Sequence, residues 1–86
     1  MSELSRACFK RDNWHCRSCH STFGLQPHHI KFRSQGGADT LDNLVTLCWI
    51  CHRAVHDGFL EVKWEREITM EGRIVVWFRR KRGWKP

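Results

Sequence analysis

Two sets of residues in this sequence have the types and the spacing of metal ligands, and the first set consists of cysteines. Four of the five cysteines form two Cys-x-x-Cys pairs, Cys16 with Cys19 and Cys48 with Cys51. Each pair can place two sulfurs on one ion from a single turn, and two pairs complete the tetrahedral shell that zinc prefers. Because the first residues contain no apolar stretch of the signal-peptide type, we expect a structural Zn²⁺ site rather than disulfides, which are the alternative for such pairs.

The second set consists of histidines. His52 and His56 are four residues apart in a helix-like segment, so they share one face and can bind one ion together. His28 and His29 are neighbours in a strand-like segment, where adjacent side chains point to opposite faces. One of these two can therefore join the helical pair. Three protein ligands would leave positions open for water and substrate, which is typical of catalytic metal sites.

The remaining histidines and the fifth cysteine lie outside both sets. His15 and His20 flank the first cysteine pair, and we expect them to be structural or exposed. Cys8 lies in a helix-like stretch and is predicted to be a buried free thiol.

The stretch between the two cysteine pairs contains 28 residues, more than the loop of an ordinary zinc ribbon. This insertion carries His28, His29 and Asn43, so a zinc ion would join the two ends of a functional excursion. A structural zinc ion supplies on the order of 10 kcal/mol of apparent folding free energy. A chain of 86 residues buries only a small core, so we expect it to depend on such an ion.

Hydrophobic periodicity predicts a small α+β fold around these residues. The predicted elements, in chain order, are a helix over 3–12, a strand over 25–30, a loop over 31–43 with a Gly36-Gly37 turn, a strand over 44–47, a helix over 49–57 that stops near Gly58, and a β-hairpin. In the hairpin, the alternation of Leu60, Val62 and Trp64 indicates the first strand, 70–73 the turn, and 74–78 the second strand. Most of the tryptophans are expected to pack in the core and the hairpin.

The chain is basic, with a formal net charge of +6. A four-thiolate zinc site would lower this charge to about +4, and a second divalent cation would restore about +6. Such a surface favours an anionic partner, most commonly nucleic acid. Two groups of cations are either solvated or in contact with phosphates: Lys31 and Arg33 in the loop, and the predicted basic tail of Arg79, Arg80, Lys81, Arg82 and Lys85.

A membrane location is not expected. The sequence has no run of about 18 apolar residues, so we predict no membrane span and a cytoplasmic protein.

Taken in order, the motifs of residues 16–58 resemble those of the HNH endonuclease family, also called His-Me finger or ββα-metal nucleases, in its form with a four-cysteine zinc knuckle. The motifs are Cys16-x-x-Cys19, Leu25-Gln26-Pro27-His28-His29-Ile30, Ser34-Gln35-Gly36-Gly37, Asp42-Asn43-Leu44, Leu47-Cys48-x-x-Cys51-His52 and His56. Phe32 stands where many members of the family have proline, which affects only the expected path of the loop.

The resemblance implies a ββα-metal core preceded by an N-terminal helix and followed by a hairpin. It divides one compact domain into a lead-in over 1–15, a nuclease core over 16–58, and a hairpin with a basic tail over 59–86. It also implies that His29 is the general base, that Asn43 braces the loop holding the base, and that a catalytic divalent cation (Mg²⁺, Mn²⁺, Ni²⁺ or Zn²⁺) is bound by His28, His52 and His56. The implied substrate is DNA, whose phosphodiester bonds the site would hydrolyse.

Two other kinds of function remain open at this point. A zinc-stabilised nucleic-acid-binding module without catalysis would keep the cysteines and the basic surface, but it would not need the histidines and Asn43 at these spacings. Alternatively, the chain would be a structural or assembly protein of a larger nuclease or packaging complex. The sequence leaves the oligomeric state and any sequence specificity open.

Overall fold

The computed structural model describes residues 2–64, 76–81 and 83–84. Its helices are α1 (Glu3–Arg11) and α2 (Trp49–His56), and its strands are β1 (Leu25–His29), β2 (Leu44–Cys48), β3 (Leu60–Trp64) and β4 (Val76–Arg80). The strands form two antiparallel two-stranded sheets, β1 with β2 and β3 with β4. The predicted α+β fold with a ββα unit and a C-terminal hairpin is confirmed.

The residues at the two ends of helix α1 account for where it begins and ends. The Ser2 side chain accepts a hydrogen bond from the Ser5 N–H at 3.1 Å, which caps the first turn. Lys10 and Arg11 lie in the last turn, where cations interact favourably with the helix dipole. After Asp12, Asn13 and Trp14 both adopt a left-handed backbone, which turns the chain toward the first cysteine pair. Cys8 and Phe9 are buried, as expected of the inner face.

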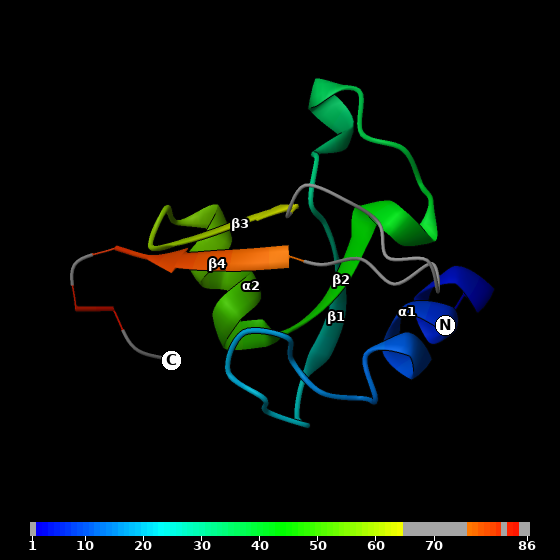
Figure 1. The fold of residues 1–86 in the computed structure, drawn as a ribbon, viewed down its shortest axis with the longest axis horizontal. Coiled ribbons are helices and arrows are strands. Elements are labelled where there is room, and N and C mark those ends of the chain that lie inside the picture. Colours follow the sequence, from blue (N-terminus) through cyan, green and yellow to red (C-terminus); the bar gives the residue numbers. More distant parts are fainter. Residues whose placement is uncertain (1, 65–75, 82, 85–86) are drawn as a thin grey trace.

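Strand β2 is the centre of the structure, since all five of its residues are buried. It pairs with β1 in a register that places His28 opposite Val45 and His29 opposite Leu44. Helices α1 and α2 both pack against this ribbon, and α2 also packs against β3 (Figure 1). One hydrophobic core therefore joins the region before Gly58 to the hairpin, through residues such as Val45, Leu47, Leu60 and Val62.

Helix α2 follows β2 without a loop, and its end determines the direction of the hairpin. Gly58 has φ 81, and its N–H donates to the Val55 carbonyl, while the Phe59 N–H donates to the Ala54 carbonyl at 2.8 Å. These two bonds form a Schellman motif, in which glycine accommodates the left-handed residue. The structure confirms the prediction that the helix stops near Gly58. The turn removes Phe59 from the helix and leaves its side chain exposed.

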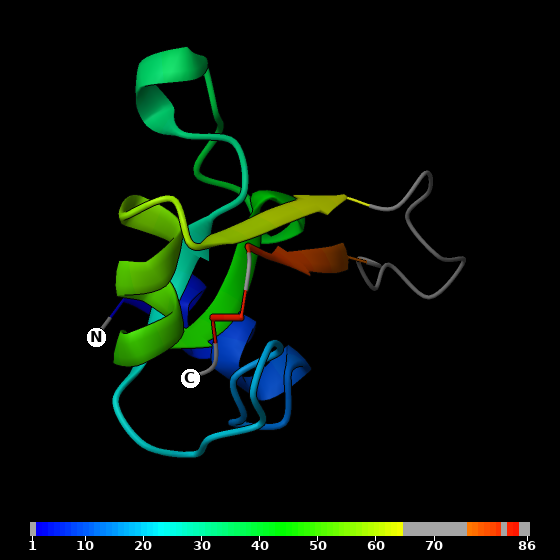
Figure 2. The same cartoon turned by 90° about the vertical axis from the view of Figure 1, so that its left-hand side faces the viewer.

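The segment between β1 and β2 projects from the body of the molecule, as both views show (Figures 1 and 2). The sequence predicts a loop here, but the segment contains two short 3₁₀ helices, Arg33–Gln35 and Leu41–Asn43. Between them the chain folds back on itself at Gly37. A Cβ atom on Gly37 would lie 1.8 Å from the Lys31 carbonyl oxygen, so only glycine permits this close approach.

The two predicted strands of the hairpin do pair, but the second strand extends further along the chain than predicted. Leu60 lies opposite Arg80 and Trp64 opposite Val76, so Arg79 and Arg80 belong to β4 rather than to a solvated tail. The predicted turn at 70–73, the first residues of the predicted strand 74–78, Arg82 and Lys85 lie outside the described residues. None of the helices in the described part of the chain has the length and hydropathy needed to cross a membrane.

Candidate metal centres and active site

The four cysteines of the two Cys-x-x-Cys pairs converge on one point. Their sulfur atoms all lie within 4.8 Å of one another, and Cys19 Sγ is 3.5 Å from Cys48 Sγ. Tetrahedral zinc with Zn–S bonds of about 2.3 Å requires sulfurs about 3.8 Å apart, so the cluster fits a zinc ion. All five cysteines carry free thiols, and Cys8 is buried apart from the cluster, as predicted.

The backbone prepares the cluster for thiolate ligands. The Cys19 N–H donates to Cys16 Sγ at 3.4 Å, and the Cys51 N–H donates to Cys48 Sγ at 3.5 Å. Burial raises the pKa of Cys16, but backbone N–H groups of Cys19, Cys48 and Ser18 outweigh burial and hold its pKa below the ordinary value. Burial and the neighbouring Cys16 sulfur raise the pKa of Cys51. Several thiolates can coexist here only if a cation compensates their charge, which is the chemistry of a zinc site.

Three of the four histidines singled out by the sequence form a second cluster. The ligand-type nitrogens of His28, His52 and His56 lie within 4.8 Å of one another. The ring of His28 lies 5.2 Å from that of His52 and 6.1 Å from that of His56, measured between centroids. Strand β1 supplies the buried His28, and one face of α2 supplies the half-buried His52 and the exposed His56. The i, i+4 spacing on the helix and the alternation on the strand together produce this convergence.

The environment of His28 favours a neutral imidazole with a free nitrogen. The residue is 2% exposed, and its Nε2 has no hydrogen-bond partner among the described residues. Burial, together with the nearby histidines 52, 56 and 29, lowers the pKa of His28 to about 4. Burial and His56 also lower the pKa of His52. A buried imidazole nitrogen without a partner is costly unless something binds it, and a divalent cation held by the three imidazoles would do so.

Phe32 lies against this cluster from the projecting loop. Its ring is stacked parallel to that of His56 at 6.0 Å and meets the ring of His28 edge-on at 5.8 Å. The sequence singles out Phe32 only as a substitution for proline. Its packing restricts the rings of two candidate ligands, which helps to hold them in position.

His29 points away from His28 and contacts a carboxylate. Its Nε2 lies 2.6 Å from Oδ1 of Asp39, and the same oxygen accepts hydrogen bonds from Arg33 Nε at 3.0 Å and Arg33 Nη2 at 2.9 Å. The hydrogen bonds from His29 and then from Arg33 lower the pKa of Asp39, which keeps it ionised. Sequence reasoning missed Asp39. The signal that could have found it is the Gly36-Gly37 turn, which returns the chain toward His29.

His28 and His29 nevertheless line the same hollow. A cavity of about 380 Å³ is lined by Pro27, His28, His29, Phe32, Arg33, Ser34, His52 and His56. The candidate ligands and His29 are thus accessible from the same space. A group in this space can contact a metal ion and a neighbouring imidazole together.

Asn43 holds the projecting loop closed at its base. Its Oδ1 accepts a hydrogen bond from the Lys31 N–H at 2.8 Å, and its Nδ2 donates to the carbonyls of Lys31 at 3.0 Å and Ala38 at 2.8 Å. The residue is buried, so these bonds are shielded from water. They connect the segment that follows His29 with the segment that leads to Asp39.

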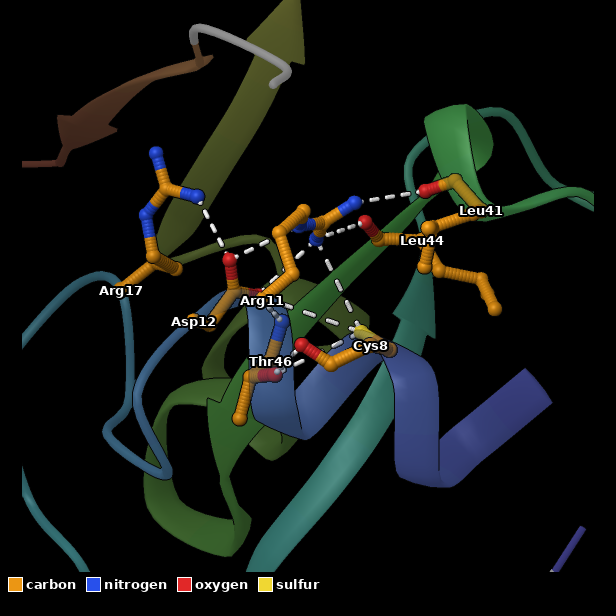
Figure 3. A network of polar contacts seen from close by, with 7 residues as sticks. All are labelled: Cys8, Arg11, Asp12, Arg17, Leu41, Leu44 and Thr46. Carbon is orange, nitrogen blue, oxygen red and sulfur yellow. Dashed lines mark hydrogen bonds and ion pairs between the residues drawn. The ribbon is translucent and has the colours of Figure 1, made fainter. Parts of the chain in front are cut away.

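A buried polar network around Arg11 and Asp12 holds the chain on both sides of Asn43 in the sequence, at Leu41 and Leu44 (Figure 3). Arg11 donates to the carbonyls of Leu41 at 2.7 Å and Leu44 at 2.6 Å, on either side of Asn43. Asp12 is 2.9 Å from Arg11 and 2.8 Å from Arg17, and it accepts from the Thr46 N–H at 3.0 Å. Burial raises the pKa of Asp12, but these hydrogen bonds outweigh it and keep the pKa below the ordinary value. Helix α1 is thereby tied to β2 and to the loop.

The candidate DNA-binding cations fall into two places. Lys31 is exposed in the loop, and Arg33 is exposed but paired with Asp39. Arg79, Arg80 and Lys81 are exposed and line a separate hollow near Phe59, while Arg82 lies outside the described residues.

Comparison with known proteins agrees with this geometry. The family model described as HNH endonuclease matches residues 16–58, which is half of the chain. The protein belongs to the HNH endonuclease family. A stretch of 32 residues is 56% identical to the type IV methyl-directed restriction enzyme EcoKMcrA of Escherichia coli (strain K12). This match covers 37% of the present chain and 12% of that relative, so the chain corresponds to a small part of it. No solved structure gave a significant match.

Proposed function

We propose that this chain is a metal-dependent endonuclease domain that hydrolyses phosphodiester bonds of DNA. The observation that carries the proposal is the convergence of His28, His52 and His56 within 4.8 Å, beside His29 in the same hollow. Membership of the HNH family and the similarity to a restriction enzyme support nuclease chemistry and DNA as the substrate class. We further propose that the four-cysteine cluster binds a structural Zn²⁺ ion.

In the proposed mechanism, the three imidazoles of His28, His52 and His56 hold the catalytic divalent cation, for which Mg²⁺, Mn²⁺, Ni²⁺ and Zn²⁺ are the candidates. When bound, such an ion supplies Lewis-acid stabilisation of the charge that develops on the phosphate and on the leaving oxygen. The imidazoles serve as ligands in their neutral form, which the lowered pKa values of His28 and His52 favour.

His29 is the proposed general base. Its Nε2–H donates to Asp39, which leaves Nδ1 to accept the proton of the attacking water. The carboxylate of Asp39 stabilises the imidazolium that results and fixes the ring orientation. General-base catalysis by a positioned histidine contributes roughly 10²–10⁴ in rate. Asn43 supports this arrangement by joining the chain at Lys31 to the chain at Ala38.

The test is cleavage of supercoiled plasmid with each of the four divalent cations, with chelator as a control. We expect metal-dependent nicking by the wild type and a loss of roughly 10²-fold or more in His29→Ala, as removal of a general base predicts. His15→Ala is the matched control, because His15 contacts the Asn13 carbonyl oxygen and does not line the hollow. If the zinc-loaded wild type cleaves plasmid with none of the four cations, the endonuclease proposal fails. The remaining function is then that of a zinc-stabilised nucleic-acid-binding module.

A further inference from the structure

A second hollow lies where the hairpin meets the end of α2. It has a volume of about 420 Å³ and is lined by Gly58, Phe59, Arg79, Arg80 and Lys81. One aromatic ring and three cations therefore surround one space, and none of the lining residues that the structure describes is a carboxylate. This combination is typical of sites that stack a nucleobase and bind its phosphate.

The Phe59 ring is available to a ligand. The side chain is 50% exposed, although a phenylalanine in a domain this small would be expected to pack in the core. Its backbone is nevertheless fixed, since its N–H donates to Ala54 and its carbonyl accepts from the Lys81 N–H at 2.9 Å. The Schellman turn at Gly58 thus presents a rigidly anchored ring beside the end of β4.

The cations around the ring are positioned by the hairpin. Arg80 lies opposite Leu60 in the register, and its guanidinium carbon is 6.0 Å from the centroid of the Trp84 ring. Among the described residues, Asp57 pairs with Arg53 at 3.5 Å, and Glu61, which lies opposite Arg79 in the register, is 3.6 Å from Lys63. The charged residues described in the lining of the hollow itself are all positive, which favours phosphate.

The hollow at Phe59 and the hollow over the histidines are related through a third cavity that shares lining residues with both. A cavity of about 250 Å³ lies between them. It shares His28 and Phe32 with the hollow over the histidines, and it shares Gly58 and Lys81 with the hollow at Phe59. A nucleic acid strand that spans these three cavities would reach Phe59 from the histidine site, past Glu61 and Lys81 in the lining of the middle cavity.

We propose that the hollow at Phe59 is a subsite for an unpaired nucleotide of the DNA substrate, with its base stacked on Phe59 and its phosphate bound by Arg79 and Lys81, which are two residues apart and share one face. A base inside a duplex is already stacked on its neighbours, so Phe59 can stack only on an unpaired base. The subsite belongs to the endonuclease proposed above and depends on that function for its role. Its binding, however, can be measured without cleavage.

The experiment measures fluorescence anisotropy of a labelled oligothymidylate about 15 nucleotides long and of a labelled duplex, with zinc-loaded protein and no added divalent cation. We expect Phe59→Ala to weaken single-strand binding about tenfold, or about 1.4 kcal/mol, and to change duplex binding less than about twofold. Phe59→Trp should retain single-strand binding. Phe23→Ala is the matched control, because Phe23 is 78% exposed and does not line the hollow.

Charge variants test the phosphate half of the subsite. Arg79→Ala and Lys81→Ala should each reduce the salt dependence of single-strand binding, by about 0.7 in the slope of log K against log salt for each phosphate that is no longer bound. Lys10→Ala, which removes an exposed cation of α1, should leave the slope unchanged. Equal single-strand affinities for Phe59→Ala and Phe23→Ala, or equal losses on single strand and duplex, would overturn the proposal. Failure of the wild type to nick plasmid overturns the endonuclease instead, so the two failures are distinguishable.

Discussion

Asp39 and His29 are ten residues apart in the sequence, yet their side chains meet at 2.6 Å between Oδ1 and Nε2. The interaction closes the projecting loop over the candidate base, and Arg33 holds the carboxylate from its other side. The proposed base therefore has a carboxylate partner that fixes the orientation of its ring. Carboxylate partners of metal-binding imidazoles are worth roughly 10- to 100-fold in metal affinity or activity, and we expect a similar magnitude for this pair.

Replacement of Asp39 tests this relationship. Asp39→Ala should lower plasmid nicking roughly 10- to 100-fold, because Nε2 loses the acceptor that orients the ring. Asp39→Asn should lose less, since its amide oxygen still accepts the Nε2–H. The measurement is the nicking rate with saturating divalent cation. Asp57→Ala removes an exposed carboxylate of the α2 C-cap and should nick at the wild-type rate. Wild-type activity in Asp39→Ala would remove Asp39 from the mechanism.

Replacement of Asn43 tests the brace at the base of the loop. Asn43→Ala removes three buried hydrogen bonds and leaves the Lys31 and Ala38 carbonyls without this donor. At about 1 kcal/mol for each bond, we expect a loss of about 2–4 kcal/mol in the free energy of unfolding, with reduced nicking. Urea denaturation measures the first effect and plasmid cleavage the second. Gln26→Ala removes an exposed amide on β1 and should change neither. A stability equal to that of the wild type would show that the bonds contribute nothing.

Removal of zinc tests the cysteine cluster. Because the ion would join Cys16 and Cys19 to the β2–α2 junction, strong chelation should unfold the chain, as a structural zinc of on the order of 10 kcal/mol requires. Circular dichroism during chelation, with zinc release followed by a colour reagent, measures this. Cys51→Ser should release zinc at lower chelator concentrations than the wild type, whereas Cys8→Ser should not, because Cys8 lies apart from the cluster. A native mass spectrum of folded protein without zinc would contradict the prediction.

The lowered pKa of His28 predicts a pH dependence of stability. The unfolded chain takes up a proton at this histidine near pH 6.5, whereas the folded chain does so only near pH 4. Between these values the unfolded state binds more protons, so stability falls as the pH decreases, by at most about 3 kcal/mol. Urea denaturation at a series of pH values measures the effect. His28→Leu should show a smaller loss over this window, and an equal loss in both proteins would assign the pH dependence to other groups.

The cysteine and histidine clusters were predictable because they depend on local geometry. A Cys-x-x-Cys pair is one turn, His52 and His56 share a helix face, and His28 and His29 alternate along a strand. Each of these relationships is set within a few residues. Only the meeting of β1 with α2 required the tertiary fold, and the burial of β2 between the two helices provides it.

The interactions that the sequence did not reveal depend on how the backbone returns upon itself. Asp39 reaches His29 because Gly37 approaches the Lys31 carbonyl so closely that no side chain fits. Phe59 follows α2 directly in the sequence, but the left-handed Gly58 turns the chain there and leaves the Phe59 side chain exposed. Arg79 lies in a run of charged residues, which have poor strand propensity. It nevertheless pairs in β4, because Phe78 of the same strand packs against the core.

The guanidinium of Arg11 has a consequence for the boundaries of this nuclease unit. The family pattern spans residues 16–58, but the donors that satisfy the carbonyls of Leu41 and Leu44 come from the helix before it. A fragment trimmed to the family pattern would lose these donors beside its own Asn43. When the unit is grafted onto a DNA-targeting protein, α1 must be carried along as part of the cassette.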